Sequence, residues 1–380
     1  MKIRLFTMVA FLYALQWGTA QTVTTLLTQP GAQFEGITWA TDGRIYVVDF
    51  ATADVYKINL TGETNKIATL RGALGGAIDA AGNYYVSEFN TGNIIKFDRE
   101  DNSNVYVSGL VGPAGILVDD ANQIMYIANY SGNSIAKVDM SAENPTPTIL
   151  ASAGRINGPD GLALTPEGDL ISCNFNDNNI QRITPEGEVT AFATLEGSPN
   201  SGYIVRRGDQ YIVPGAYGPD IYTLSLTGEV SRFAGTGAAG YTDGAASESQ
   251  FRFPNGIAIS PTGDTLLITE SATAGHIRML TNLDGVSNTD VLQSVQAVRI
   301  SPNPASERVH IEMYLVEASN LQINIIDLST NVVDTLFAQS SFQGQFSVDF
   351  DLPNRLAPGA YFVQIQAGKE LQHYTLVVRE

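Results

Sequence analysis

A unit of about forty residues recurs six times along the chain, and this repeat constrains the fold more than any other feature. Each unit opens with a small-residue turn and a glycine-apolar pair, and then continues through a turn into an apolar strand. The six openings lie at residues 34–37, 75–78, 114–117, 160–163, 201–204 and 255–258. Second and third strands follow in step, and a fourth follows in five units. Four short strands per unit form the blade of a β-propeller, so the sequence predicts an all-β, six-bladed propeller.

The last unit lacks a fourth strand of its own, and the other end of the chain offers one. Residues Thr22–Thr28 precede the first opening just as Val189–Leu195 precedes the fifth. A strand taken from the N-terminus would close the ring and remove two exposed sheet edges. We therefore predict that the propeller covers residues 21–283 and is closed by its N-terminal strand.

The first twenty residues have the pattern of a secretory signal peptide. Lys2 and Arg4 form a basic start, Leu5–Trp17 is apolar, and Gly18–Ala20 offers a small-residue cleavage site. The apolar run is shorter than the ~20 residues of a membrane span, and no later stretch is apolar enough. The sequence predicts an exported protein without a membrane span once residues 1–20 are removed.

The repeat stops near Gln296, after an expected linker at residues 284–295. Short alternating strands follow at residues 309–313, 321–326, 346–350, 361–365 and 374–378. Alternation of this kind with turn residues between the strands is typical of a small antiparallel sandwich. We expect an Ig-like β-sandwich over residues 296–380.

The net charge and the few reactive side chains limit the classes of function that the sequence allows. The formal net charge is −18, and a chain this acidic repels phosphate backbones, so nucleic acid is not an expected partner. Divalent cations, cationic ligands and neutral sugars remain open. Cys173 is the only cysteine and lies in an apolar strand, which predicts a buried inert thiol. His276 is expected to cap a turn, and no phosphate-binding loop or other motif points to an organic cofactor.

Antiparallel pairing within a blade places two residues at one mouth of the central channel: the residue before the opening glycine and the residue that ends the second strand. The first position gives an inner set of Glu35, Gly75, Ala114, Asp160, Ser201 and Asn255. The second position gives an outer set of Asp49, Glu88, Asn129, Asn174, Pro214 and Glu270.

The two sets combine carboxylates and amides and contain no Lys or Arg. Clustered carboxylates cannot all ionise cheaply, so one takes up a proton or a cation binds, and calcium prefers such oxygen ligands. We predict that Glu35, Asp160 and Asn255 hold calcium or another divalent cation, assisted by Asn129 or Asn174. The outer side chains Asp49, Glu88, Asn129, Asn174 and Glu270 would line a ligand-binding mouth. The alternative is that these polar residues only cap strands and turns.

Two stretches of the propeller resemble known families. Residues 235–244, followed by 251–256, are similar to the inter-blade signature of NHL repeats. Glu35–Trp39 with Gly43–Asp49 resembles the opening blade of the senescence-marker-protein/gluconolactonase group. This resemblance implies a metal held by Glu, Asn and Asp side chains, with Glu35 and the Asp160 of Pro-Asp-Gly in matching motifs. The family's intervening Asn positions fall near Leu74 and Ala114, and Pro-Asp-Gly lies one blade earlier than in the family.

The C-terminal segment resembles the type A sorting domain of the type IX secretion system. Three motifs carry this resemblance in the family's order: Ile300–Ala305, Leu356–Tyr361 and Thr375–Arg379. The resemblance implies that residues 296–380 are recognised by the type IX machinery of a Gram-negative bacterium. The protein would then be secreted or held at the cell surface. The alternative is an ordinary Ig-like accessory module.

Two classes of function follow from these patterns. The first is a secreted propeller that binds a small molecule, a glycan or a protein at the polar mouth, with a divalent cation there. The second is a calcium-dependent lactone or ester hydrolase in which Glu35 and Asp160 hold a metal that polarises a carbonyl or a water.

Overall fold

The computed structural model describes residues 21–152, 154–198, 200–283, 295–303, 305–327, 331–352, 356–367 and 370–379. The predicted signal peptide and residues 284–294 of the predicted linker lie outside the described residues. The regular elements within these ranges are all β-strands. No helix in this part of the chain is long and apolar enough to cross a membrane.

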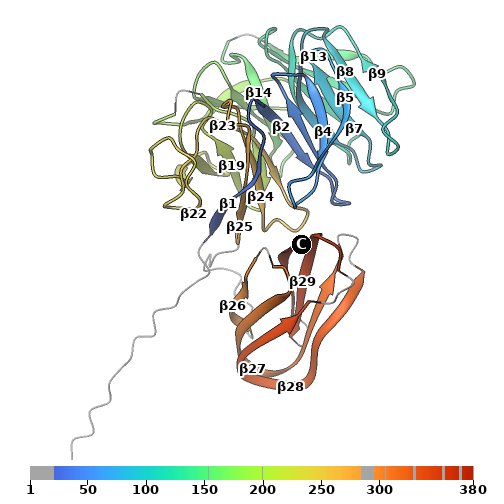
Figure 1. The fold of residues 1–380 in the computed structure, drawn as a ribbon. Helices are drawn as coiled ribbons and strands as arrows, with labels where there is room; N and C mark the ends of the chain where they lie inside the picture. Colours follow the sequence, from blue (N-terminus) through green and yellow to red (C-terminus); the bar gives the residue numbers. More distant parts are fainter. Residues whose placement is uncertain are drawn as a thin grey trace, which may run out of the picture.

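Five blades of the propeller are four-stranded antiparallel sheets whose strands pair in chain order (Figure 1). The first blade contains β2 (Phe34–Trp39), β3 (Ile45–Asp49), β4 (Asp54–Ile58) and β5 (Thr64–Thr69). The second contains β6 (Ala73–Ile78), β7 (Tyr84–Glu88), β8 (Asn93–Phe97) and β9 (Ser103–Val107). The third contains β10 (Pro113–Asp119), β11 (Ile124–Asn129), β12 (Ser134–Asp139) and β13 (Pro147–Ser152). The fourth contains β14 (Pro159–Leu164), β15 (Leu170–Asn174), β16 (Asn179–Ile183) and β17 (Val189–Thr194). The fifth contains β18 (Val205–Arg207), β19 (Gln210–Pro214), β20 (Ile221–Ser225) and β21 (Val230–Ala234).

The sixth blade joins the two ends of the propeller sequence. Its order is β22 (Gly244–Ala245), β1 (Thr22–Thr28), β25 (His276–Thr281), β24 (Leu266–Glu270) and β23 (Pro254–Ile259). Strand β1 pairs antiparallel with β25, from Thr22 opposite Thr281 to Thr28 opposite His276. The prediction of a six-bladed propeller closed by the N-terminal strand is confirmed.

Glycines on the innermost strands let neighbouring blades touch around the axis. A Cβ atom on Gly36 would lie 2.5 Å from the carbonyl oxygen of Leu74 in the next blade. A Cβ on Gly256 would likewise collide with the carbonyl oxygen of Glu35, which returns the contacts from the sixth blade to the first. Comparable backbone contacts are made by Gly75, Gly115, Gly161 and Gly202. Because side chains do not fit there, the six innermost strands approach the axis closely.

A buried arginine links the closing strand to its neighbours. Arg278 in β25 is fully buried, and its guanidinium lies 2.7 Å from Asp243 Oδ1 and 3.4 Å from Glu270 Oε1. Asp243 also accepts a hydrogen bond of 2.9 Å from the backbone N–H of Thr25 in β1. Arg278 therefore connects the loop before β22, the N-terminal strand and β24.

The C-terminal domain is a single sheet of long, bent strands with one hydrophobic core. It contains β26 (Val295–Ser301), β27 (Arg308–Ile326), β28 (Val332–Asp351), β29 (Gly359–Ala367) and β30 (Glu370–Val378). The short strands expected at residues 309–313 and 321–326 are one strand here. Register shifts between Leu315 and Leu321 allow β27 to bend, so that its first half pairs with β26 and its second half with β29. The bend gives a sandwich-like domain, as predicted, from five strands, of which β26 was not expected and β27 combines two expected strands.

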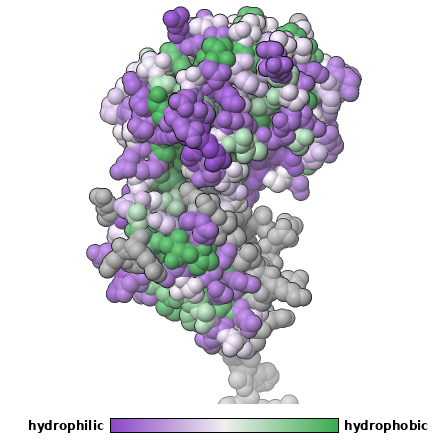
Figure 2. All heavy atoms as spheres, turned by 90° about the vertical axis from the view of Figure 1, so that its right-hand side faces the viewer, coloured by the Kyte–Doolittle hydropathy of each residue, from purple (hydrophilic) through white to green (hydrophobic). Residues whose placement is uncertain are grey.

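The C-terminal domain packs against the end of the propeller that lies away from the predicted mouth (Figure 1). Val377 of β30 is buried in the same apolar cluster as Leu267 and Ile277 of the sixth blade. Asp264 accepts hydrogen bonds from the N–H and hydroxyl of Thr375, at 3.1 and 2.8 Å. Asp264 lies in the turn from β23 to β24, at the opposite end of this hairpin from the mouth. Outside this contact, the face in Figure 2 shows a largely hydrophilic propeller surface and an apolar patch on the C-terminal domain.

Substitution Arg278→Ala tests the importance of the buried link. It would leave Glu270 as a buried carboxyl without its cation, and breaking a buried pair in this way costs about 3–5 kcal/mol. We expect the free energy of unfolding, measured by urea denaturation of the mature protein, to fall by that amount. The exposed Arg99→Ala variant serves as the control, with a change below about 0.5 kcal/mol. Equal, small effects of both substitutions would show that the link does not stabilise the closed ring.

Candidate functional site

Four predicted inner residues share one level of the central channel. Each is the second residue of an innermost strand whose first residue pairs with the last residue of the second strand. They are Glu35, Ala114, Asp160 and Asn255. The predicted register is therefore correct in the first, third, fourth and sixth blades.

The predicted register is wrong by one residue in the second blade. Ala73 pairs with Glu88, so Leu74 occupies the level of Glu35, and Gly75 does not. Two adjacent glycines follow Leu74, and the sequence period alone does not show which of them begins the repeat. The second blade contributes an apolar side chain at this level.

The fifth blade differs from the prediction by two residues. The N–H of Gly202 donates to the carbonyl of Pro214 at 3.1 Å, which places Tyr203 at the level where Ser201 was expected. Ser201 is buried, and its hydroxyl instead donates to the carbonyl of Asn174 in the fourth blade, at 2.9 Å. The opening of this blade is irregular, because its innermost strand β18 has only three residues.

Glu35, Asp160, Tyr203 and Asn255 form what we call the axial cluster. The side-chain amide of Asn255 donates a short hydrogen bond to Glu35 Oε2. Tyr203 reaches across the channel, because a Cβ atom on Gly75 of the second blade would lie 2.8 Å from its hydroxyl. Asp160 Oδ1, Asn255 Oδ1 and the Tyr203 hydroxyl are buried and make no hydrogen bond of good geometry in the described part of the chain, although the Tyr203 hydroxyl lies close enough to Asp160 to oppose the rise of its pKa.

Burial without a cation changes the titration of the cluster. Desolvation raises the pKa of Glu35 to about 7, against the opposite effect of hydrogen bonds from Ser271 and Asn255. Desolvation and the nearby charge of Glu35 raise the pKa of Asp160 to about 8, against the opposite effect of the Tyr203 hydroxyl. Desolvation, followed by the charges of Asp160 and Glu35, raises the pKa of Tyr203 well above its ordinary value. No cationic side chain contributes to either carboxyl shift, so at least one carboxyl carries a proton at neutral pH.

The outer residues hold the loops that lead into the innermost strands. Each accepts a hydrogen bond from a backbone N–H just before its innermost strand, through the side chains of Asp49, Glu88, Asn129, Asn174 and Glu270. The distances are 2.9, 2.9, 3.3, 3.1 and 2.8 Å. This arrangement fits the alternative of strand and turn caps. Contact of these five side chains with a ligand stays a prediction.

Five aromatic side chains, which we call the aromatic collar, follow one another around this mouth. The collar consists of Phe89, Tyr130, Phe175, Tyr217 and Phe253. Ring centroids of successive members are 6.0, 6.0, 5.5 and 5.4 Å apart, and their planes are inclined by 59° to 73°. Tyr217 is 53 % exposed, and the other four are half-buried. In the first blade, Phe50 takes the equivalent sequence position and is 45 % exposed.

The collar lies over the axial cluster. Burial raises the pKa of Tyr130, and the neighbouring charge of Asp160 adds to this rise. The prediction from sequence missed both the collar and Tyr203. A signal for the collar was present, because an aromatic residue directly follows the outer residue in each of the first four blades.

The two other reactive side chains of the propeller are not part of the cluster. Cys173 is fully buried, and burial raises its pKa, in agreement with an inert thiol. His276 accepts or donates a hydrogen bond of 2.9 Å with the Thr28 hydroxyl, and its ring lies 4.4 Å from that of Tyr241. Burial lowers the pKa of His276, so it is neutral at the closing strand at pH 7.

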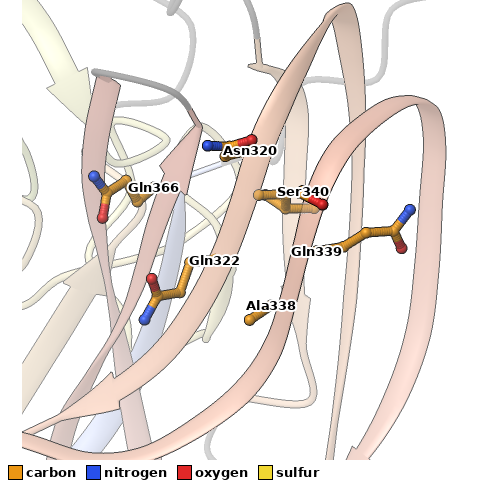
Figure 3. A pocket seen from close by; sticks show the side chains of 7 residues that line it. Asn320, Gln322, Ala338, Gln339, Ser340 and Gln366 are labelled. Carbon is orange, nitrogen blue, oxygen red and sulfur yellow. The ribbon is translucent and has the colours of Figure 1, made fainter.

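Two open hollows lie away from the channel axis. One, of about 360 Å³, lies on the C-terminal sheet between β27, β28 and β29, where Asn320, Gln322, Gln339 and Gln366 supply amides (Figure 3). The other, of about 390 Å³, lies beside the fourth blade and is lined by Arg155, Asn157, Asp177, Asn179 and Gln181 among others. Neither contains a member of the axial cluster. Within the described ranges, no three His, Cys, Asp or Glu side chains are grouped to hold a metal ion.

Two family models match parts of the chain. Residues 90–201, which include Asp160, match the family described as "SMP-30/Gluconolactonase/LRE-like region". Residues 299–379 match the family described as "Secretion system C-terminal sorting domain". The second match confirms the predicted sorting domain, which indicates export to the cell surface or the medium of a Gram-negative bacterium and handling by the type IX machinery. No curated protein matches the chain.

Solved structures with the same fold have distant sequences. A protein of unknown function from Bacteroides thetaiotaomicron is 16 % identical with a TM-score of 0.57, over 69 % of this chain and 76 % of that one. A gluconolactonase from Xanthomonas campestris is 14 % identical with a TM-score of 0.56, over 70 % and 90 %. A calcium-binding protein, regucalcin, from Agrobacterium tumefaciens is 14 % identical with a TM-score of 0.53, over 69 % and 93 %. These similarities show the propeller fold and agree with the resemblance read from the opening blade.

The raised pKa values predict how stability depends on pH. Between pH of about 4 and 8, the folded protein keeps a proton on Asp160 that the unfolded chain has lost, so stability falls as pH rises through this window. Asp160→Asn removes this effect. We compare the free energy of unfolding of Asp160→Asn with that of the parent. The variant should gain a few kcal/mol over the parent from pH 4 to pH 9, because each unit of pKa shift corresponds to about 1.4 kcal/mol.

The measurement is urea denaturation of the mature protein across this pH range. The control is Asp209→Asn, at an exposed residue in the turn between β18 and β19, and it should parallel the parent. A parallel curve for Asp160→Asn as well would mean that Asp160 has an ordinary pKa in the folded protein.

Proposed function

We propose that this exported propeller binds a small ligand at the mouth of its central channel, with the axial cluster as the polar end of the site. The observation that carries the proposal is the pair of buried oxygens, Asp160 Oδ1 and Asn255 Oδ1, that have no partner among the described residues. Leaving such atoms unsatisfied costs about 1–3 kcal/mol each, and a bound group removes this cost. The aromatic collar supplies apolar surface above the cluster. Ligand sites usually combine such an apolar lining with a few polar groups.

The axial cluster provides some of the oxygen ligands that a bound calcium ion requires. Carboxylate and amide oxygens are the ligands that calcium prefers, and Glu35, Asp160 and Asn255 offer them at one level of the channel. Calcium takes about 6–8 oxygens, so water or an organic ligand would have to complete its shell. The match to the gluconolactonase-like family and the calcium-binding neighbour support this part of the proposal.

Hydrolysis of a lactone or ester is the second candidate function. Two observations favour it: the family match spans Asp160, and desolvation raises the pKa of both carboxyls, to about 7 for Glu35 and about 8 for Asp160. A carboxyl that titrates near neutral pH can exchange a proton with a reacting group, and a bound metal would polarise the carbonyl. Tyr203 occupies the middle of the channel beside them, which restricts a substrate to the mouth.

Calcium binding is tested by isothermal titration of the mature, metal-free protein. We expect a heat of binding and a raised melting temperature in excess calcium, because a ligand that binds only the folded state stabilises it. Asp160→Asn and Glu35→Gln should each weaken binding at least about tenfold, and Asp209→Asn should leave it unchanged. If the protein gives neither heat nor a shift in melting temperature, calcium is not the occupant.

The hydrolase candidate is tested with a panel of aldonolactones and aryl esters. If the cluster is catalytic, a chelator or Glu35→Gln should reduce kcat/KM by about a hundredfold or more, on the scale of a lost acid–base or metal-holding group. Asp209→Asn again serves as the control. Full activity of Glu35→Gln, or no turnover by the intact protein, would reject this candidate.

A further inference from the structure

The polar groups of the axial cluster are mainly carboxyls and hydrogen-bond acceptors. Two carboxyls point into a channel where no described cation pairs with them, and an oxygen of Asp160, which is 3 % exposed, lacks any partner. The side-chain N–H of Asn255 donates to Glu35, and the Asn255 oxygen, which lies against Gly202 of the fifth blade, has no hydrogen-bond partner in the described part of the chain. The polar end of the site therefore offers acceptors and potential negative charge.

The aromatic collar above the cluster also presents negative electrostatic potential to a ligand. An aromatic face carries partial negative charge, and the rings of the collar are inclined to one another rather than stacked in pairs. Cations are attracted to such faces when they lie within about 6 Å of the ring centroid. One member already has this contact, since the guanidinium of Arg252 lies 5.9 Å from the centroid of Phe253.

The backbone of the rim is held in an uncommon conformation where two collar members meet. Tyr217 has φ = 57° and Phe253 has φ = 56°, values that bulky residues rarely adopt. Their rings are 5.4 Å apart and nearly perpendicular. Tyr130 is fixed separately, because its hydroxyl donates to Asn176 Oδ1 at 2.6 Å. The backbone at Tyr217 and Phe253 and the hydrogen bond of Tyr130 thus restrain three of the five members of the collar.

We infer that the mouth takes an organic ammonium group, seated with its charge above Glu35 and Asp160 and its alkyl groups against the aromatic collar. A neutral sugar would satisfy the hydrogen-bond acceptors but would leave an ionised carboxyl of the pair without a countercharge. An alkylated ammonium satisfies both parts of the site, because its charge compensates the carboxyls and its methyl groups cover the rings. This inference uses the mouth of the proposed function and adds the chemical class of its ligand.

A matched pair of probes tests the inference. Choline and its neutral isostere 3,3-dimethylbutan-1-ol have the same shape, and only choline is charged. Each is titrated into the mature full chain by calorimetry, in the presence of EDTA so that metal plays no part. We expect choline to bind at least about tenfold more tightly than the isostere. Equal affinities, or binding of methyl glucoside in preference to choline, would overturn the inference.

Variants of the collar and of the cluster separate the two parts of the site. Phe175→Leu keeps an apolar side chain but removes an aromatic face between Tyr130 and Tyr217, and it should weaken choline binding about fivefold to tenfold. Asp160→Asn should weaken it at least as much. Tyr314→Leu removes an exposed aromatic side chain from the C-terminal domain and should have no effect. Unchanged affinity in both site variants would place the ligand elsewhere, and melting curves verify that each variant is folded.

The calcium titration keeps this inference distinct from the proposed function. Binding of calcium without binding of choline overturns the inference and leaves the proposed site intact. Binding of choline in EDTA without any binding of calcium supports the inference and removes the metal from the proposal. If both bind, they meet the same two carboxyls, so excess calcium should displace choline.

Discussion

The close approach of six innermost strands determines what the rest of the molecule can do. Their glycines allow backbone contact from blade to blade, and the last contact, from Gly256 to the carbonyl of Glu35, completes the circle. Because the strands meet at the axis, side chains from the first, fourth, fifth and sixth blades reach one small space. Two of them are carboxyls that the protein itself does not neutralise. A less compact ring would let water reach both carboxyls, and their pKa values would be ordinary.

The positions of the closing strand and the C-terminal domain leave this space open. Strand β1 completes the outer part of the sixth blade, and Arg278 and Asp243 connect it to the blade interior. The sorting domain contacts the same blade through Asp264 and Val377, at the end opposite to the collar. The sorting domain and the proposed ligand site therefore lie at opposite ends of the propeller. Neither of these two contacts involves a residue of the axial cluster or of the aromatic collar.

The sequence predicted the architecture because the repeat encodes it directly. Six openings and a missing fourth strand were enough to predict the number of blades and their closure. The repeat period did not predict every side chain of the site, because a shift of one residue in the register of an innermost strand brings a different side chain to the axis. Leu74 and Tyr203 were missed for this reason: adjacent glycines obscure the first position, and a shortened innermost strand obscures the second. The collar requires contacts between blades, which no single repeat contains.

The central claim is that the half-buried Glu35 and the buried Asp160 lie together on the axis without a compensating cation. Carbon-13 NMR titration of the aspartate carboxyl carbons tests it most directly, with the Asp160 signal assigned by its loss in Asp160→Asn. For the metal-free, ligand-free protein, we predict a pKa of about 8 for Asp160 and a lower value once Glu35→Gln removes the neighbouring charge. A pKa near the ordinary 3.8 in the parent, or no response to Glu35→Gln, would contradict the claim.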